Sequence, residues 1–480
     1  MGEGRVGADS DKMGPQTLRR MREMTETNRP PGSGGTKISR RDLLKSIGAG
    51  AGVLAAPGLL AACGDDEGAA TTTTADGTAA AGGAGTVAPS GTVSVGSNAS
   101  DPLTKDAYGA AYDEFSARTG VELKVNTVDH NTFQEQINTY LQGRPDDVFT
   151  WFAGFRMQFF ADRGLATSIN DVWDEIGGRF SDAFKQASTG LDGDQYFVPF
   201  VTYPWALFYR KSVFEENGYA IPTTLEELKA LCEAMVGDDL IPIAFGDKDG
   251  WPAMGTFDYL NMRVNGYQFH VDLMAHREKW NDERVKQVFS TWADLLPYHQ
   301  PGALGRTWQE AAQTVANKEA GMYLLGMFVG EQFQEVSQEA RDDLDFFAFP
   351  EINPEHAQDS VDAPIDGFML SKDPANLDGA KELLKFMGSG EAQKYYTDAN
   401  SNWLQTANDG DTSGYTGLQN KAVKLIASVD NIAQFLDRDT RPDFASTVVL
   451  PSLQTFLNDP ADIVGLTDSM EEQAAAIFES

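Results

Sequence analysis

From residue 92 onward the sequence alternates short β-rich runs with amphipathic stretches, an order that few folds can accommodate. The first series predicts strands at 92–96, 121–128 and 146–151, with helices at 102–118 and 131–141 between them. This order is typical of a doubly wound α/β sheet with parallel strands. Ligands of such sheets bind beyond the carboxyl ends of the strands, so the residues that directly follow the first and third strands are expected near a cleft.

A second α/β series follows the first. Its predicted elements are strands at 206–211, 240–245, 320–326, 344–350 and 363–371, and helices at 225–236, 282–297 and 308–318. Thr224 and Glu227 have the spacing of a capping box at the start of a helix. After residue 375 the pattern is helical except for a loop at 401–415. The absence of a repeat of about 20–50 residues argues against a solenoid or a propeller.

Charge and cysteine content exclude several classes of protein. The chain has 38 Lys and Arg residues against 71 Asp and Glu residues, a net charge of −33, which repels nucleic acids and anionic lipids. Its two cysteines, Cys63 and Cys232, cannot build a disulfide framework or a cysteine-ligated metal centre. The five histidines show no metal-ligand spacing, so we predict no metal and no cofactor. The negative charge predicts that the protein has no nucleic-acid partner. Cys232 lies in an apolar helical run, and we expect it to be buried.

The first ninety residues have a different character from the rest. Arg40 and Arg41, followed by two leucines and a Gly/Ala-rich run to residue 62, resemble a twin-arginine export signal. Leu60-Ala61-Ala62-Cys63 resembles a lipobox, in which the cysteine sulfur receives a lipid. Residues 64–91 contain no aromatic side chain and predict a flexible tether. Removal of 1–62 leaves 28 basic and 65 acidic residues, 28 − 65 = −37. We therefore predict an exported protein that Cys63 anchors to the extracytoplasmic face of a bacterial cell membrane.

The order of motifs from 92 to 480 resembles that of the family 1 extracellular solute-binding proteins, the sugar-binding subunits of bacterial ABC importers. The blocks that carry the resemblance lie at 145–165, 195–200, 207–218, 221–228, 318–322 and 361–367. The resemblance implies a two-lobed periplasmic-binding-protein-like fold of type II, in which hinge strands cross between the lobes. It predicts the following organisation: a signal region at 1–62, a tether at 63–91, an N-terminal lobe of 92–204 plus 327–365, and a C-terminal lobe of 205–326 plus 366–480.

The resemblance also implies the function and the partners. We expect a monomer without enzymatic activity that encloses a sugar or oligosaccharide by hinge closure and delivers it to an ABC permease and its ATPase subunits. Two alternatives remain open at this point. The same fold could bind a polyamine through carboxylates and aromatic rings, or the chain could be an exported glycoside hydrolase or lyase, since acidic residues are plentiful.

A sugar presents C–H patches on its faces and hydroxyls at its edge, so its site needs aromatic platforms and planar polar groups. The aromatic candidates are Trp151, Phe152, Tyr203, Trp205, Trp251, Phe328 and Trp403. The resemblance implies sugar contact at Phe152, Trp251, Phe328 and Trp403. The polar candidates are Asp366, whose carboxylate can accept two hydroxyl protons, and Asn98 and Asp101, which follow the first strand. Arg156 could stack or donate, or it could equally be a solvated helix residue.

Overall fold

The computed structural model describes residues 38–39 and 90–479. The predicted export signal and tether therefore lie outside the described residues apart from 38–39 and 90–91, and so do Arg40, Arg41 and Cys63. None of the described helices combines the length and the apolar character that a membrane span requires.

The larger sheet of the described chain has the strand order β12-β5-β11-β4-β2-β3. Its strands are β2 (Thr92–Ser97), β3 (Glu122–Thr127), β4 (Val148–Phe152), β5 (Phe197–Thr202), β11 (Ile365–Leu370) and β12 (Leu404–Gln405). The first three strands pair in parallel, with α3 (Pro102–Thr119) and α4 (His130–Gln142) as their connections, as the sequence predicts. The strand β11 runs antiparallel to both of its neighbours, β4 and β5.

A helical layer completes the first lobe, which we define as this sheet and the helices packed on it. These helices are α5 (Phe155–Asp162), α6 (Asn170–Ile176), α7 (Asp182–Ala187), α16 (Leu377–Met387) and α17 (Gly390–Ala399), together with α3 and α4. Because helices cover the sheet, β4 and β5 are buried along their whole length. Gly367 lies where the register between β11 and β5 shifts, and a Cβ there would overlap the carbonyl oxygen of Val198, so this close approach requires glycine.

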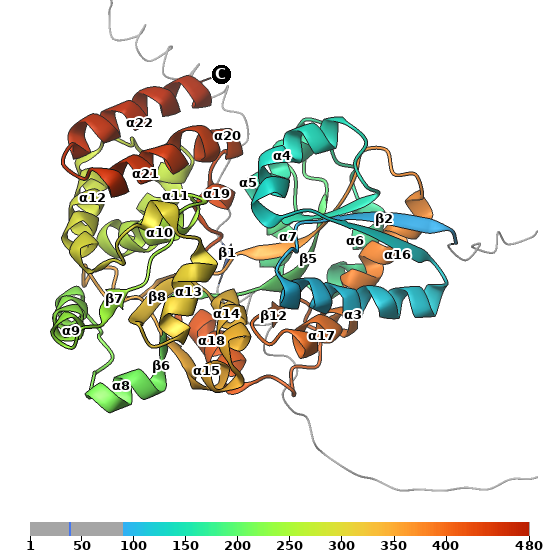
Figure 1. Cartoon of the computed structure of the whole chain (residues 1–480). Helices are drawn as coiled ribbons and strands as arrows, with labels where there is room; N and C mark the ends of the chain where they lie inside the picture. The colour runs from blue at the N-terminus through green and yellow to red at the C-terminus, as the bar shows by residue number, and fades with distance from the viewer. Residues whose placement is uncertain (1–37, 40–89, 480) are drawn as a thin grey trace, which may run out of the picture. The chain divides into compact units, whose positions relative to one another are not determined.

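The second sheet has the order β7-β8-β6-β9 and forms the centre of the second lobe. Its strands are β6 (Trp205–Arg210), β7 (Ile241–Ile243), β8 (Ala320–Gly326) and β9 (Leu344–Phe347). The helices in the left half of Figure 1 include α8 (Lys211–Asn217), α9 (Leu225–Gly237), α10 (Pro252–Asn265), α11 (Tyr267–Met274), α12 (Glu283–Leu295), α13 (Trp308–Ala316), α14 (Gly330–Val336), α15 (Gln338–Asp343), α18 (Gly417–Ser428), α21 (Leu450–Asn458) and α22 (Ile463–Phe478).

A small third sheet brings together three short segments that are far apart in the sequence. It pairs β1 (Ile38–Ser39), β13 (Asn431–Ala433) and β10 (Ser360–Asp362), and β13 leads into the short helix α19 (Leu436–Asp439). Farther along the chain lie α20 (Pro442–Phe444) and a π-helical turn, η5 (Ala445–Val449).

The strands of the second half group differently from the expected lobes. Segment 327–365 was assigned to the N-terminal lobe, yet β9 hydrogen-bonds to β6 of the second sheet. Conversely, β11 and β12 belong to the first sheet, although 366–480 was assigned to the C-terminal lobe. The assignment fails because the chain stays in the second lobe from β8 to β9. It crosses to the first lobe between β9 and β11, and it returns after β12. Local periodicity predicts a strand but not its neighbour in the sheet.

Helix termini follow the local sequence closely. Thr224 and Glu227 form the predicted capping box at the start of α9, and Gly120 ends α3 in the left-handed conformation. Cys232 on α9 is fully buried, as expected, and burial raises the pKa of its thiol to about 12. Such a thiol packs in the core as a small apolar side chain and is not a reactive group.

Candidate functional site

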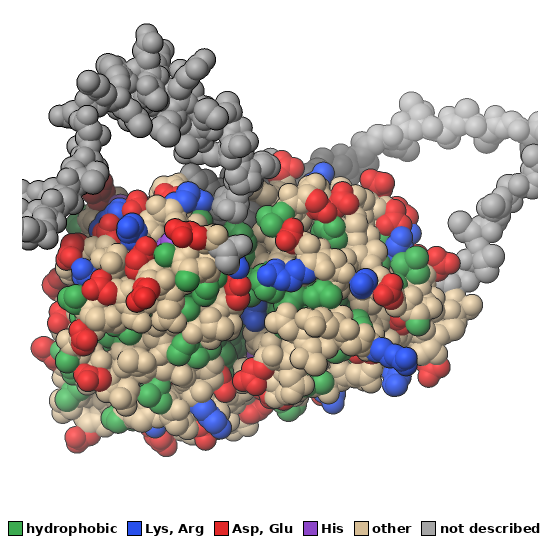
Figure 2. Space-filling view, turned by 90° about the horizontal axis from the view of Figure 1, so that it is seen from above, with side chains coloured by type: hydrophobic (Ala, Val, Ile, Leu, Met, Phe, Trp, Pro, Cys, Tyr) green, Lys and Arg blue, Asp and Glu red, His purple; other side chains and the backbone are tan. Residues whose placement is uncertain are grey.

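A cavity of about 100 Å³ lies between the two lobes. Its wall on the first lobe comes from the carboxyl ends of β2 and β4, where the strand order predicts a cleft. On the second lobe it is lined by the start of β6 and the N-terminal residues of α10 and α13. In the view of Figure 2, hydrophobic and basic side chains lie together along the middle of the surface.

All of the predicted ligand-binding residues except Trp151 line this cavity: Asn98, Asp101, Phe152, Tyr203, Trp205, Trp251, Phe328, Asp366 and Trp403. Trp151 is buried in β4, its ring packs against Phe160, and its Nε1 donates a 3.2 Å hydrogen bond to the carbonyl oxygen of Arg156. Neighbouring residues of a strand face opposite ways, so the strand that presents Phe152 to the cavity must turn Trp151 away from it.

Aromatic rings form one continuous wall. The centroid of the Trp251 ring lies 6.2 Å from that of Trp205, 6.3 Å from Trp308 and 6.1 Å from Phe328. The ring of Trp403 stacks on Phe328 at 6.1 Å with an interplanar angle of 28°. The buried Nε1 atoms of Trp205 and Trp251 have no hydrogen-bond partner among the described residues. The wall therefore offers flat apolar faces to the cavity.

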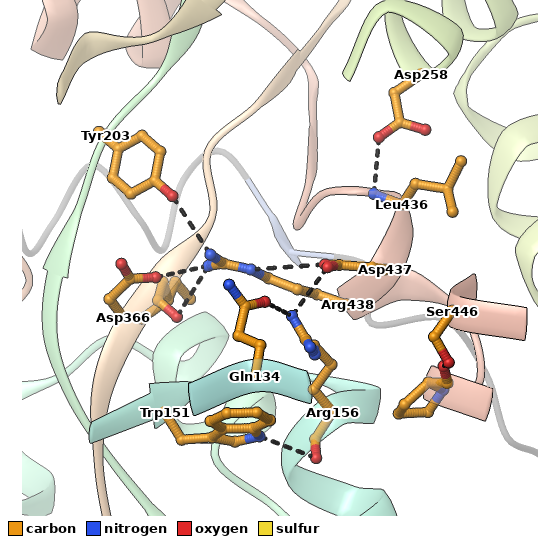
Figure 3. A network of polar contacts seen from close by, with 12 residues as sticks. Gln134, Trp151, Arg156, Tyr203, Asp258, Asp366, Leu436, Asp437, Arg438 and Ser446 are labelled. Carbon is orange, nitrogen blue, oxygen red and sulfur yellow. Dashed lines mark hydrogen bonds and ion pairs between the residues drawn. The ribbon is translucent and has the colours of Figure 1, made fainter. Parts of the chain in front are cut away.

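Opposite charges face the cavity in pairs (Figure 3). Arg438 donates from Nη1 to Oδ1 of Asp366 at 2.7 Å and from Nη2 to the hydroxyl of Tyr203 at 3.3 Å. Arg156 donates from Nη1 to Oδ2 of Asp437 at 2.9 Å. Burial raises the pKa of Asp366, and the adjacent Arg438 opposes that rise. Since each carboxylate has a guanidinium beside it, this side of the cavity carries hydrogen-bonding groups without a large excess of charge.

A buried carboxyl fixes part of the aromatic wall. Oε1 of Glu331 accepts hydrogen bonds from Oγ1 of Thr104 at 2.7 Å, from Nδ2 of Asn400 at 2.8 Å and from Nε1 of Trp403 at 2.9 Å. Burial raises the pKa of Glu331 to about 7, although these three hydrogen bonds favour the charged form. Glu331 therefore titrates near neutral pH, in contact with an aromatic ring of the cavity.

The predicted polar residues after β2 also hold fixed positions. Oγ1 of Thr150 donates to Oδ1 of Asn98 at 2.8 Å, which couples the ends of β2 and β4. Nε2 of Gln309, on α13 of the second lobe, donates to Oδ1 of Asp101 at 3.3 Å. This second bond spans the two lobes at the edge of the cavity.

Sequence reasoning missed about half of the lining. The residues it did not propose are Ala99, Thr104, Tyr108, His130, Gln134, Trp308, Glu331, Tyr396, Phe435, Asp437 and Arg438, and it left Arg156 open. Trp308, which directly follows the capping residue Thr307, carried the same signal as the other tryptophans and could have been found. Arg438 could not, because its partner Asp366 lies 72 residues earlier in the chain.

The arrangement is suited to non-covalent recognition. It combines flat rings and paired charges, which together can hold a polar molecule that has apolar faces. Among the residues that the structure describes, no group of three or more His, Cys, Asp or Glu side chains could hold a metal ion.

Comparisons with known proteins agree with this geometry. The family model of the bacterial extracellular solute-binding proteins matches residues 100–394. The crystal structure of the bacterial solute receptor AcbH, described as having an exclusive substrate preference for β-D-galactopyranose, is 46% identical, with a TM-score of 0.79 over 81% of this chain and 99% of AcbH.

Two curated proteins are also similar. An ABC transporter extracellular-binding protein of Pyrococcus horikoshii is 26% identical over 78% of this chain and 82% of its own length. The α-glucosides-binding periplasmic protein AglE of Rhizobium meliloti is 30% identical over 33% of this chain and 37% of its own length.

Proposed function

The chain belongs to the bacterial extracellular solute-binding proteins, and on that premise we propose that it captures a single pyranose sugar, galactose being the first candidate, for an ABC importer. The observation that carries this proposal is the aromatic wall of Trp251 and its neighbours, which lines the same cavity as the paired charges of Arg438 and Asp366. Rings can cover the C–H faces of a sugar, while the guanidinium and carboxylate groups bind its hydroxyls.

A similar solved structure bears on the size of the ligand. The preference described for AcbH, which shares 46% of its residues with this chain, supports galactose as the first sugar to test.

The charges in the cavity disfavour a polyamine. Of the four carboxyls in the lining, Asp366 is engaged by Arg438 and Asp437 by Arg156, whereas Asp101 and Glu331 have only neutral hydrogen-bond donors among the described residues. The two guanidinium groups would repel a polycation at short range. We therefore place a neutral, hydroxylated ligand ahead of a polyamine.

The proposed cellular role follows from export. The twin arginines would direct secretion, a lipid on Cys63 would hold the protein at the membrane, and the residues up to 91 would act as a tether. The monomeric protein would then close on its ligand and present it to a permease driven by ATPase subunits. The proposal includes no chemical conversion of the ligand.

A thermal-shift panel tests the proposal. The purified protein would be melted with galactose, glucose, disaccharides, polyols and spermidine, and each ligand that raises Tm would be titrated by calorimetry. A ligand at 100 times its Kd adds about 2.7 kcal/mol to the free energy of unfolding, so a true ligand gives a clear shift. We expect galactose or a close stereoisomer to bind intact. A shift with spermidine alone would refute the sugar assignment, and release of new sugar products would revive the hydrolase alternative.

A further inference from the structure

The segment 434–439, which we call the cavity turn, contributes three residues to the lining of the ligand cavity: Phe435, Asp437 and Arg438. The ring of Phe435 stacks on that of Trp205, with a centroid distance of 4.9 Å and an interplanar angle of 29°. The guanidinium of Arg438 donates to Asp366 at 2.7 Å. The shape of this turn therefore decides where one ring and one positive charge of the cavity lie.

The backbone of the cavity turn is strained at Phe435. Its φ is +111°, a conformation that a bulky side chain rarely adopts and that persists only where the surrounding structure holds it. The N–H groups of Arg438 and Asp439 donate to the carbonyl oxygen of Phe435 at 2.8 and 3.0 Å, but both bonds lie within the turn. Contacts from outside the turn are needed to hold its position in the protein.

Two buried carboxyls accept hydrogen bonds from the backbone of the turn. The N–H of Leu436 donates to Oδ2 of Asp258 at 2.7 Å (Figure 3), and the N–H of Gln434 donates to Oδ2 of Asp439 at 2.8 Å. Asp439 belongs to the turn itself, whereas Asp258 lies on α10 of the second lobe. Asp258 is fully buried and is not part of the cavity lining. It therefore anchors the turn to a long helix from outside the cavity.

Asp258 is one of three carboxyls that the fold buries close together. Burial raises the pKa of Asp258 well above its ordinary value, and the charges of Asp362 on β10 and Asp439 on α19 raise it further. Burial and the charge of Asp439 likewise raise the pKa of Asp362. Burial raises the pKa of Asp439 to about 7. We call these three residues the carboxyl cluster.

The groups around the cluster offset its charge only in part. The titratable and charged side chains that face it come from three helices: Tyr259 and Arg263 on α10, Tyr267 and His270 on α11, and Asp437 and Arg438 on α19. Nε2 of His270 lies 3.9 Å from Oδ1 of Asp258, but burial lowers the pKa of this imidazole to about 3, so it is uncharged at neutral pH. Burial raises the pKa of both tyrosines, which are neutral as well. The two arginines oppose the rise in the pKa of Asp362 without cancelling it.

We propose that Asp258 is a positioning residue, which holds the cavity turn in the shape that brings Phe435 and Arg438 to the ligand. Through the carboxyl cluster, the same contact makes ligand affinity depend on pH. If the turn relaxes, the carboxyls reach water and release protons, so the binding-competent shape holds more protons. Affinity should therefore fall as the pH rises from 3.8, the ordinary value for aspartate, to about 7. The inference rests on the proposed function in that it takes the ligand to bind in this cavity.

Two substitutions at position 258 separate the anchor from its charge. Asp258→Ala removes the acceptor of the Leu436 N–H, and at pH 6 we expect the Kd of galactose, measured by calorimetry on the full chain, to rise by about tenfold or more. Asp258→Asn keeps an oxygen that can accept this N–H, so its Kd should stay within about threefold of that of the unmodified protein. Each substitution removes one of three mutually repelling carboxyls and leaves no new buried charge unpaired, so we expect both proteins to fold.

The pH profile tests the coupling to the cluster. Asp258→Asn removes one titrating group, so its Kd should rise less steeply with pH. Between pH 5 and pH 8, the ratio of the Kd of the unmodified protein to that of Asp258→Asn should increase by about threefold or more. Glu331 titrates in the same range, but it is present in both proteins and its contribution cancels in the ratio. A ratio that does not change with pH would overturn the coupling, and unaltered affinity of Asp258→Ala would overturn the positioning role.

Hydrogen exchange tests the anchor without any ligand. In the ligand-free full chain, the amides of 434–439 should exchange about tenfold faster in Asp258→Ala than in the unmodified protein. Asn261→Ala is the matched control, because Asn261 is also fully buried on α10 and its side chain contacts His270 and Asn265 rather than the turn. It should change neither this exchange nor the Kd by more than about twofold. If the unmodified protein binds no sugar, the proposed function fails, whereas unchanged exchange in Asp258→Ala refutes the anchor itself.

Discussion

Nε1 of Trp403 donates a 2.9 Å hydrogen bond to Oε1 of Glu331, which ties one ring of the ligand cavity to a carboxyl that titrates near neutral pH. The pKa of Glu331 rises from 4.5 to about 7 on folding, because burial penalises its charge. The folded state therefore holds this proton more tightly than the unfolded state does. The resulting stabilisation is complete below pH 4.5 and is lost as the pH rises toward 7.

Replacing Glu331 with Gln should remove this pH dependence. The amide oxygen of Gln can accept the same three hydrogen bonds without a charge. Relative to the unmodified protein, Glu331→Gln should gain stability between pH 5 and pH 8, by at most about 3 kcal/mol. Urea unfolding at several pH values measures the difference, which also cancels the contributions of other buried acids. A difference that stays constant over this range would contradict the prediction.

The unused indole donor of Trp251 should contribute to binding. Trp251→Phe keeps an aromatic ring but removes Nε1, and the loss of one hydrogen bond of about 1 kcal/mol should weaken sugar binding by about fivefold. Trp173→Phe makes the same chemical change outside the cavity, where Nε1 bonds the carbonyl oxygen of Phe197 at 2.9 Å. Calorimetry should find less than a twofold effect there. Equal effects of the two substitutions would argue against a role for the Trp251 indole in binding.

The carboxylate of Asp366 should matter more than a single neutral donor. Asp366→Asn retains the shape of the side chain but loses its charge, so both Arg438 and the ligand hydroxyls lose an ionised acceptor. Hydrogen bonds to charged groups contribute about 1.5–3 kcal/mol, so we expect affinity to fall by about tenfold or more. Asp345→Asn, which breaks the surface pair with Lys421 at 2.6 Å, serves as the control. Sugar binding that is unaffected by Asp366→Asn would remove this residue from the site.

The predicted lipid anchor can be tested in a cell that exports the protein. Cys63→Ser removes the sulfur that would carry the lipid, so the protein should move from the membrane fraction to a soluble extracytoplasmic fraction. Replacing Arg40 and Arg41 with Lys keeps the charge but removes the arginine pair, and the protein should then remain in the cytoplasm. Immunoblots of the separated fractions measure both. Continued membrane association of the Cys63→Ser protein would refute the anchor.

Local patterns predicted the first half of the fold well. The observed helix α3 (Pro102–Thr119) and strand β3 (Glu122–Thr127) begin and end within one residue of the predicted segments. The strand β5 (Phe197–Thr202) is not among the predicted strands, and the lobes predicted for β9 and β11 are wrong. Pairing between distant strands leaves no local trace, because a buried strand reads as apolar whichever strand it joins.

The same physical limit applies to the site. Trp151 and Phe152 are adjacent in a strand that is buried along its whole length, so no alternation of polar and apolar residues showed which of them faces the cavity. Aromatic residues at strand ends and loops were found by residue type alone. Asp437 and Arg438 were missed because their partners, Arg156 and Asp366, are brought to them only by the tertiary fold.

The place of β11 between β4 and β5 has a consequence for the order of folding. During synthesis, β4 and β5 emerge well before Ile365–Leu370, the segment that lies between them in the sheet and pairs with both. The first sheet therefore cannot be completed until more than two-thirds of the chain has been made. Its completion is a long-range step, and closing the long intervening segment costs a large conformational entropy. A fragment that ends before residue 360 would leave two inner strand edges exposed, and it should aggregate rather than form a stable lobe.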